Sequence, residues 1–201
     1  DYSLLSSLAL TTTIIYLSLL IASIIVYYFA GLIVRISMEF PNTNILFQLF
    51  KYFPAFFFAI IFVYWFGNSF WAELLFSFCV SIFFFKKRIF ELSGSINNNY
   101  LTIAKNLGMS DNEIFTNVIR KSILPELFNT VTPIHNYLWI IILIYEFIAN
   151  SDGLGGVYNT ALLYNDFITL FSIAIMISLL IWFGNSVIKF INRKIFFWEA
   201  E

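Results

Sequence analysis

The sequence predicts an all-α membrane protein that crosses the bilayer about five times, and three observations lead to that prediction. Of the 201 residues, 60% are hydrophobic and 11% are charged, whereas a soluble domain carries roughly 25% charged residues. Several charge-free runs approach or exceed the ~20 residues that cross a ~30 Å hydrocarbon core as a helix. Basic and acidic residues also alternate between successive loops. A water-soluble fold is excluded, because it could not bury so much apolar surface.

Four charge-free runs mark the most evident spans, at residues 2–34, 52–72, 127–145 and 167–188. A fifth run, 74–85, is shorter, and it reaches spanning length if Glu73 lies at one interface and Lys86 at the other. The sequence starts with Asp1 and enters an apolar run almost at once, so we expect that a further N-terminal span is missing from it.

The distribution of charge predicts the orientation in the membrane. If the spans alternate with Asp1 outside, all 11 basic residues fall on one side. The other side receives Asp1, Glu73, Asp152 and Asp166, without Lys or Arg. Because Lys and Arg concentrate in cytoplasmic loops, we expect a multi-pass protein of the cytoplasmic (inner) membrane with a cytoplasmic C-terminus. The basic residues are Arg35, Lys51, Lys86, Lys87, Arg88, Lys105, Arg120, Lys121, Lys189, Arg193 and Lys194.

The longest polar stretch, residues 97–127, falls on the predicted cytoplasmic side and has the pattern of two helices joined by a glycine. The first helix has apolar residues at helical spacing and ends at Gly108, a residue suited to the positive φ of a helix C-terminus. Ser110 and Glu113 form the S-x-x-E capping box of the second helix. Pro125 limits how far that helix continues. The apolar stripe of the second helix is Ile114, Phe115, Val118, Ile119 and Ile123.

Three stretches carry a family resemblance. The polar segment, with Ala104, Gly108, Val118 and Leu124-Pro125, resembles the cytoplasmic loop of ABC-importer permeases, although Thr102 and Arg120-Lys121 depart from the usual pattern. "FPAFFFAIIFVYWFGNS" and "WIIILIYEFIANSDGLG" are similar to two spans of the nitrate, sulfonate and taurine permeases. The resemblance covers nearly the whole chain. It implies a single permease domain over residues 1–201, with a coupling loop at about 97–125.

The resemblance implies a transport subunit that works with partners. They are a cytoplasmic ABC ATPase dimer, a second permease copy in a homodimer, and an extracytoplasmic substrate-binding protein. ATP and Mg²⁺ would bind to the ATPase, because this chain has no Gly-rich loop ending in Gly-Lys-Ser/Thr. We therefore expect no enzymatic activity, no cofactor and no nucleic-acid partner. The resemblance implies that the ATPase is coupled through Thr102, Ala104, Gly108, Ser110, Glu113, Ile114, Phe115, Val118, Leu124 and Pro125.

The substrate stays open at this point. A small anion or nutrient is expected, with sulfonate, taurine, nitrate, bicarbonate and vitamin precursors as candidates. A methionine- or phosphonate-type permease is the alternative within transport. A membrane scaffold or passive channel, with the polar segment resting on lipid headgroups, is the alternative outside it.

Few polar residues lie within the predicted spans, and these are the candidates for the translocation path. Glu146 either lines the path or hydrogen-bonds the following turn of Gly153, Leu154 and Gly155 on the periplasmic side. His135 is either packed or faces the path, and Trp139 follows it by one helical turn. No metal site is expected, because Cys79 and His135 are the only cysteine and histidine.

Overall fold

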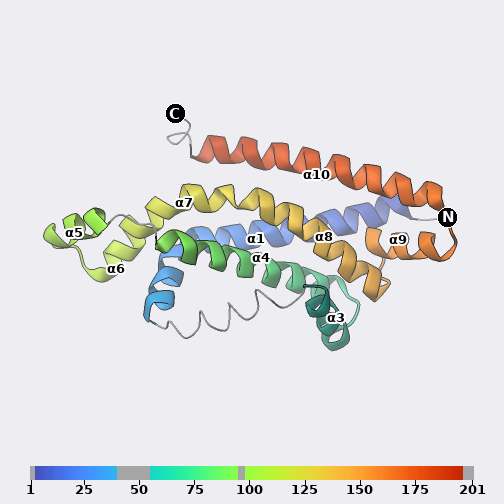
Figure 1. Ribbon diagram of the computed structural model, residues 1–201, viewed down its shortest axis with the longest axis horizontal. Coiled ribbons are helices and arrows are strands. Elements are labelled where there is room, and N and C mark those ends of the chain that lie inside the picture. Colours follow the sequence, from blue (N-terminus) through green and yellow to red (C-terminus); the bar gives the residue numbers. More distant parts are fainter. Residues whose placement is uncertain (1–2, 40–54, 95–97, 197–201) are drawn as a thin grey trace.

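The computed structural model describes residues 3–39, 55–94 and 98–196, and within them the secondary structure is entirely helical. The prediction of an all-α membrane fold is confirmed. Long helices lie side by side along the longest axis of the molecule (Figure 1). The helices are α1 (Leu4–Glu39), α3 (Ala55–Phe66), α4 (Phe70–Ser93), α5 (Asn98–Asn106), α6 (Asp111–Glu113), the π-helix η1 (Ile114–Ile119), α7 (Arg120–Asn129), α8 (Val131–Ala149), α9 (Leu154–Leu163) and α10 (Phe167–Ile195).

Among the described helices, α1, α8 and α10 are long and apolar enough to cross a membrane. The 24 residues of α4 extend over about 36 Å, which also suffices, although charged residues occupy both of its ends. Within the described residues α3 has 12 residues, and it is apolar throughout. Five predicted spans thus correspond to five helices, of which α3 is too short by itself.

The span predicted within the charge-free run 52–72 ends before that run does, because two helices meet within it. The helix α3 ends at Phe66, and Gly67 follows with a φ of 71°, which reverses the course of the backbone. A new helix then starts at Phe70, and the side chain of Ser69 caps it by accepting a hydrogen bond from the Ala72 N–H at 3.2 Å. Hydropathy alone does not register this break, because Asn68 and Ser69 are only two polar residues between apolar runs on both sides. Pro54 and Lys51 lie outside the described residues.

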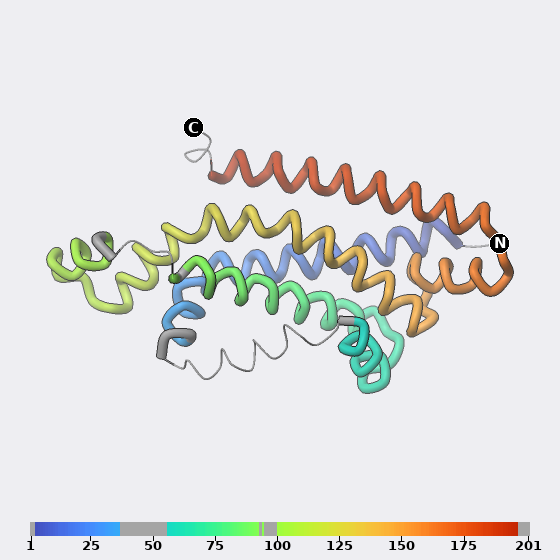
Figure 2. The backbone as a smooth tube through the Cα atoms, viewed as in Figure 1, coloured from blue at the N-terminus to red at the C-terminus, as the bar shows by residue number. Residues whose placement is uncertain are grey.

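The chain passes alternately from one end of the molecule to the other. Followed from blue to red in Figure 2, α1 and α4 run in one direction, α8 returns, and α10 runs in the first direction again. The C-terminal parts of α1, α4 and α10 therefore lie at the same end as α5, α6 and α7 (Figure 1). These are the parts that carry the described basic residues, so the structure gathers them at one end, as predicted.

The centre of the fold is formed by α1, α4 and α8. The helices α1 and α4 approach closely, and Ser18 and Ser77 share a hydrogen bond of 2.6 Å between their hydroxyl oxygens. Phe62, Phe76 and Tyr145 bring α3, α4 and α8 together, with ring centroids 5.0 Å apart between Phe76 and Tyr145. By contrast, α10 lies on the outside of this centre, and its apolar side chains are largely exposed, as lipid-facing residues are.

A glycine contact joins the polar loop to the first span. A Cβ atom on Gly31 of α1 would lie 2.4 Å from the backbone carbonyl oxygen of Phe115 in η1. No side chain fits there, so the two helices touch through their backbones. Gly184 likewise permits close approach between helices, whereas Gly67 permits a turn of the backbone.

We predict that Gly31→Ala destabilises the fold by about 1–3 kcal/mol, because the carbonyl of Phe115 belongs to a helical backbone and cannot move aside cheaply. Thermal unfolding of the detergent-solubilised protein measures this loss. Gly94→Ala is the matched control, since its Cβ would meet the Glu91 carbonyl oxygen at an ordinary 3.7 Å. Equal unfolding temperatures for the two variants would contradict the close contact.

Candidate functional site

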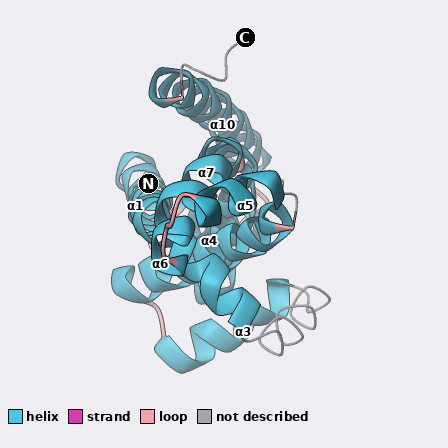
Figure 3. Ribbon diagram, turned by 90° about the vertical axis from the view of Figure 1, so that its left-hand side faces the viewer, coloured by secondary structure: helices cyan, strands magenta, loops and turns pink. Residues whose placement is uncertain are grey.

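The polar loop projects beyond the spans at the basic end, where Figure 3 views it end-on. Its first helix, α5, ends in a Schellman motif: the Gly108 N–H donates to the Lys105 carbonyl at 2.9 Å, and the Met109 N–H donates to the Ala104 carbonyl at 3.1 Å. Gly108 has a φ of 77° and no neighbouring atom within 4 Å of a built Cβ. The predicted glycine joint is confirmed, and its reason is backbone conformation rather than crowding.

The predicted capping box is also present. The Ser110 hydroxyl oxygen accepts from the Glu113 N–H at 3.4 Å, and the Glu113 carboxylate accepts from the Ser110 N–H at 2.8 Å. These reciprocal bonds fix the first residues of α6. The joint between α5 and α6 is therefore defined on both sides, by the glycine before it and by the capping box after it.

The second helix continues further than predicted. The segments α6, η1 and α7 follow one another without interruption from Asp111 to Asn129, and Pro125 lies inside α7. The prediction that Pro125 limits the helix is wrong, because burial of Ile123, Leu124 and Leu127 holds α7 in place across the missing proline N–H. Within η1 the hydrogen bonds are one residue longer than in an α-helix: the Arg120 N–H donates to the Phe115 carbonyl.

The apolar stripe of the second helix packs inward. Ile114, Ile119 and Ile123 are buried, and Phe115 and Val118 pack against the same core. Of the residues expected to couple to an ATPase, Ala104, Ile114, Leu124 and Pro125 are buried in this chain, whereas Thr102, Gly108, Ser110 and Glu113 are exposed. The stripe packs against the spans because the second helix leads directly into α8. That stripe is thus not accessible to another protein.

The exposed apolar residues of the loop lie on α5 instead. Tyr100, Ile103 and Leu107 are 59%, 55% and 75% exposed. Their spacing of three and four residues puts them on one face of the helix. Periodicity alone finds both apolar stripes, but it does not tell which one is buried within the chain and which one stays exposed. We call the exposed residues the α5 face.

At the opposite end of the molecule, Glu146 holds the start of α9. Its carboxylate accepts from the Gly155 N–H at 2.8 Å and from the Thr11 hydroxyl at 2.6 Å. The Thr11 hydroxyl oxygen in turn accepts from the Leu154 N–H at 2.9 Å. Two of the first N–H groups of α9 are thereby satisfied from α8 and α1, and Glu146 is fully buried. The predicted hydrogen bond between Glu146 and the glycine turn is confirmed.

The turn 153–156 needs its glycines. A Cβ on Gly153 would lie 2.1 Å from Oε1 of Glu146, and one on Gly155 would lie 2.3 Å from the Leu143 carbonyl oxygen. A Cβ on Gly156 would lie 1.8 Å from the Ser151 carbonyl oxygen. These glycines bring the backbone of α9 against the carboxylate. Thr11 was not expected, and the sequence does not distinguish it from the threonines that follow it at 12 and 13.

A second polar network joins α1, α8 and α10 around His135. The His135 Nε2 accepts from the Trp139 indole N–H at 3.0 Å and lies 3.1 Å from the Tyr16 hydroxyl oxygen. The His135 Nδ1 lies 2.9 Å from Oδ1 of Asn185. Gly184 makes room for these groups, since its Cβ would lie 2.2 Å from the Tyr16 oxygen. The prediction of a packed, hydrogen-bonded histidine is confirmed.

The three candidates for the translocation path, Glu146, His135 and Trp139, are all fully buried among helices of the same chain. In this conformation their side chains are not on a surface that a solute could reach. The polar network of His135 continues through the half-buried Asn185 to the exposed Asn136, two residues that the sequence analysis did not single out. Asparagines within apolar spans were the available signal for them.

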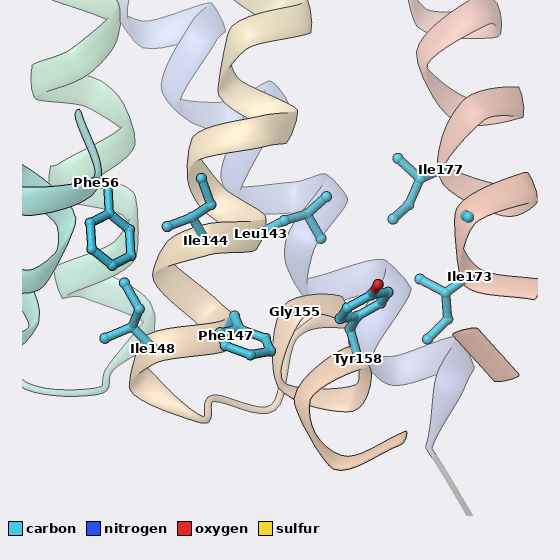
Figure 4. A pocket seen from close by; sticks show the side chains of 10 residues that line it. Phe56, Leu143, Ile144, Phe147, Ile148, Gly155, Tyr158, Ile173 and Ile177 are labelled. Atoms are coloured by element: carbon cyan, nitrogen blue, oxygen red, sulfur yellow. The ribbon is translucent and has the colours of Figure 1, made fainter. Parts of the chain in front are cut away.

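Near the α9 end lies an apolar pocket of about 460 Å³ between α3, α8, α9 and α10. Figure 4 shows side chains from α8, such as Leu143 and Phe147, facing Ile173 and Ile177 of α10 across it. Its lining exposes no polar surface. Among the described residues, no three His, Cys, Asp or Glu side chains are grouped as metal ligands would be.

The fold and these features define a multi-pass helical membrane protein with a structured polar loop at its basic end. A family model described as the binding-protein-dependent transport system inner membrane component matches residues 43–197. The chain therefore belongs to this family of transport components, and its recognition as an ABC-importer permease is confirmed. A comparison with curated proteins finds no significant match.

Among solved structures, a chain of the MetNI methionine ABC transporter in inward-facing conformations is similar, with a TM-score of 0.71 and 13% sequence identity. The match covers 96% of this chain and 94% of that chain. At this identity the likeness concerns the fold alone. The narrower likeness to nitrate, sulfonate and taurine permeases stays a prediction.

We predict that Glu146→Ala loosens the start of α9 and destabilises the protein by about 1–3 kcal/mol, because the buried Gly155 N–H loses its partner. Thermal unfolding measures the loss, and hydrogen exchange at residues 154–157 locates it. Glu91→Ala is the control, an exposed carboxylate paired with Arg88, for which less than about 1 kcal/mol is expected. Unchanged exchange in α9 would refute the role of Glu146.

The capping box predicts a pH effect confined to the polar loop. Hydrogen bonds from the Ser110 hydroxyl and N–H hold the pKa of Glu113 below its ordinary value of 4.5. The folded pKa is below the unfolded one, so the stabilisation is complete above pH 4.5 and is lost as the pH falls through the folded value. The protection of residues 110–113 against hydrogen exchange, expressed relative to the unfolded chain at the same pH, is expected to fall on acidification. Glu113→Gln should remove this pH dependence, and its persistence would exclude the Glu113 carboxylate as the cause.

Proposed function

We propose that this chain is the membrane-spanning permease subunit of an ATP-driven importer, coupled to a cytoplasmic ABC ATPase through the loop 97–125. The observation that carries the proposal is the α5 face, three exposed apolar side chains at the tip of a rigidly jointed loop. Exposed apolar residues on a projecting element are typical of a protein-binding surface. Family membership supplies the transport context.

The contacts of the loop suggest how a movement of α5 would reach the spans. The second helix touches α1 through Gly31 and Phe115, and α4 through the Arg88–Glu126 ion pair. It reaches α10 through the Asn192 amide, which donates to the Phe128 carbonyl at 2.8 Å. A force applied to α5 would thus act on three spanning helices together. The buried residues of the loop would serve coupling by stiffening it, and the exposed ones by meeting the ATPase.

The remaining parts of the importer follow from this assignment. ATP and Mg²⁺ bind to the ATPase dimer, a second permease copy completes the path, and an extracytoplasmic protein delivers the solute. The basic end, with α5 and the C-terminus, faces the cytoplasm under the positive-inside rule. Closure of the ATPase dimer would alternate the spans between inward-open and outward-open arrangements.

For the substrate we propose a small anion or nutrient, such as a sulfonate, taurine, nitrate, bicarbonate or a vitamin precursor. Methionine is the second candidate, because the similar solved structure is that of a methionine transporter. The sequence resemblance favours the first group, and the structural likeness favours the second. Uptake of labelled taurine, nitrate and methionine by proteoliposomes distinguishes them.

We predict that Leu107→Asp abolishes binding of the ATPase and lowers ATP-driven uptake at least tenfold, because it puts a charge on the most exposed residue of the α5 face. Co-purification of the ATPase and uptake into proteoliposomes measure the two effects. Lys105→Gln, an exposed residue outside the α5 face, is the control and should retain both. Uptake that needs no ATP, or that survives Leu107→Asp, would favour the passive channel instead.

A further inference from the structure

The polar network around His135 ends at the surface of the protein within the membrane-spanning part. Asn185 of α10 donates from Nδ2 to Oδ1 of Asn136 on α8 at 2.8 Å. Asn136 is exposed, and it lies five residues, about 7 Å, along α8 from its first residue. An amide at this depth is poorly placed against lipid, because hydrocarbon offers no hydrogen-bonding partner. The exposed amide therefore needs a polar partner from outside this chain.

The direction of the hydrogen bonds that lead from His135 to Asn136 follows from the Trp139 donor. The indole N–H can only donate, so the His135 Nε2 that receives it carries no proton. A neutral imidazole then holds its proton on Nδ1, which donates to Oδ1 of Asn185. The amide nitrogen of Asn185 is thereby turned toward Asn136 and donates to its oxygen.

This sequence of bonds leaves the Asn136 amide with its oxygen turned inward and its nitrogen available. The two N–H bonds on Nδ2 of Asn136 have no partner within the described part of the chain. Lys189, also exposed, follows Asn185 by four residues on α10, so its position is on the same side of that helix. Donors and a positive charge, with no carboxylate in the network, are the chemistry that receives an oxyanion.

We propose that Asn136, oriented by Asn185, His135 and Trp139, is a recognition residue for an oxygen-rich anionic group of the transported solute, a carboxylate, sulfonate or nitrate. The inference rests on the proposed transport function and adds to it the chemical class recognised within the membrane. The buried His135 and Trp139 take part without touching the solute: they set which end of the Asn136 amide is presented. His135 and Trp139 are thus positioning residues.

Asn136→Asp is the sharpest test, since it keeps the shape of the side chain and replaces the outward donors with an acceptor. Uptake of taurine, nitrate and methionine by proteoliposomes containing the permease and its ATPase is expected to fall at least tenfold. Asn136→Gln, which keeps the donors, should retain a substantial part of the uptake. Asn129→Asp, the same change at an exposed asparagine of α7, is the matched control and should leave uptake unchanged.

The positioning role has a separate readout. Trp139→Phe removes the donor that fixes the histidine tautomer. The side-chain amides of Asn185 and Asn136 then become free to flip, exchanging the positions of oxygen and nitrogen. We expect a higher KM for the solute with an intact permease–ATPase complex, and ¹⁵N chemical shifts of His135 that no longer show Nδ1 protonated and Nε2 unprotonated. A tautomer that is unchanged together with a raised KM would overturn this part of the proposal.

The outcomes separate the inference from the function on which it rests. If the wild-type complex shows no ATP-dependent uptake of any of the three solutes, the proposed function fails. If uptake is present and Asn136→Asp does not reduce it, the inference fails alone. If Asn136→Asp splits the permease pair, as judged by mass in solution, the donors serve subunit contact and the inference is overturned. The inference is likewise overturned if Asn136→Asp lowers uptake in vesicles containing phosphatidylglycerol but not in vesicles of pure phosphatidylcholine, because the recognised anion is then a lipid.

Discussion

The structure depends on one constraint: a polar group placed within the bilayer must find its partner inside the protein. Glu146 and Thr11 satisfy it at one end by receiving the first N–H groups of α9, and the His135 network satisfies it further along. Both arrangements connect helices that are far apart in sequence. The polar residues of the spans therefore determine which helices stay together, whereas the abundant phenylalanines supply bulk.

The same constraint explains the division of the polar loop. Its second helix is continuous with the spans and buries its apolar stripe on them, with Gly31 allowing backbone contact at Phe115. The first helix is set off by Gly108 and retains an exposed apolar face. In a loop built in this way, the second helix is packed on the spans and the first helix presents an exposed apolar surface. This arrangement suits the transmission of movement between two proteins.

Much of this fold could be predicted from the sequence, because hydropathy, charge and capping are local signals. The spans, the glycine joint at Gly108 and the capping box of Ser110 and Glu113 depend on neighbours within a few residues. The break at Gly67 also has local signals, the glycine and the Ser69 cap, which hydropathy does not count, whereas the passage of α7 through Pro125 depends on packing by distant segments. The hydrogen-bond partners of Glu146 and His135 could not be predicted from local sequence either, since Thr11 and Asn185 are separated from them by 135 and 50 positions.

The π-helical segment η1 gives the loop a property of its own. A π-helix accommodates one residue more than an α-helix over the same rise, and each residue of an α-helix turns the chain by about 100°. Loss of a single residue between Ile114 and Ile119 would therefore let the segment return to α-helical pitch, while the turns before and after it keep their relative orientation. This chain could thus lose one residue in η1 without turning its tip, whereas the same loss within α7 would rotate α5 by about 100° relative to the spans.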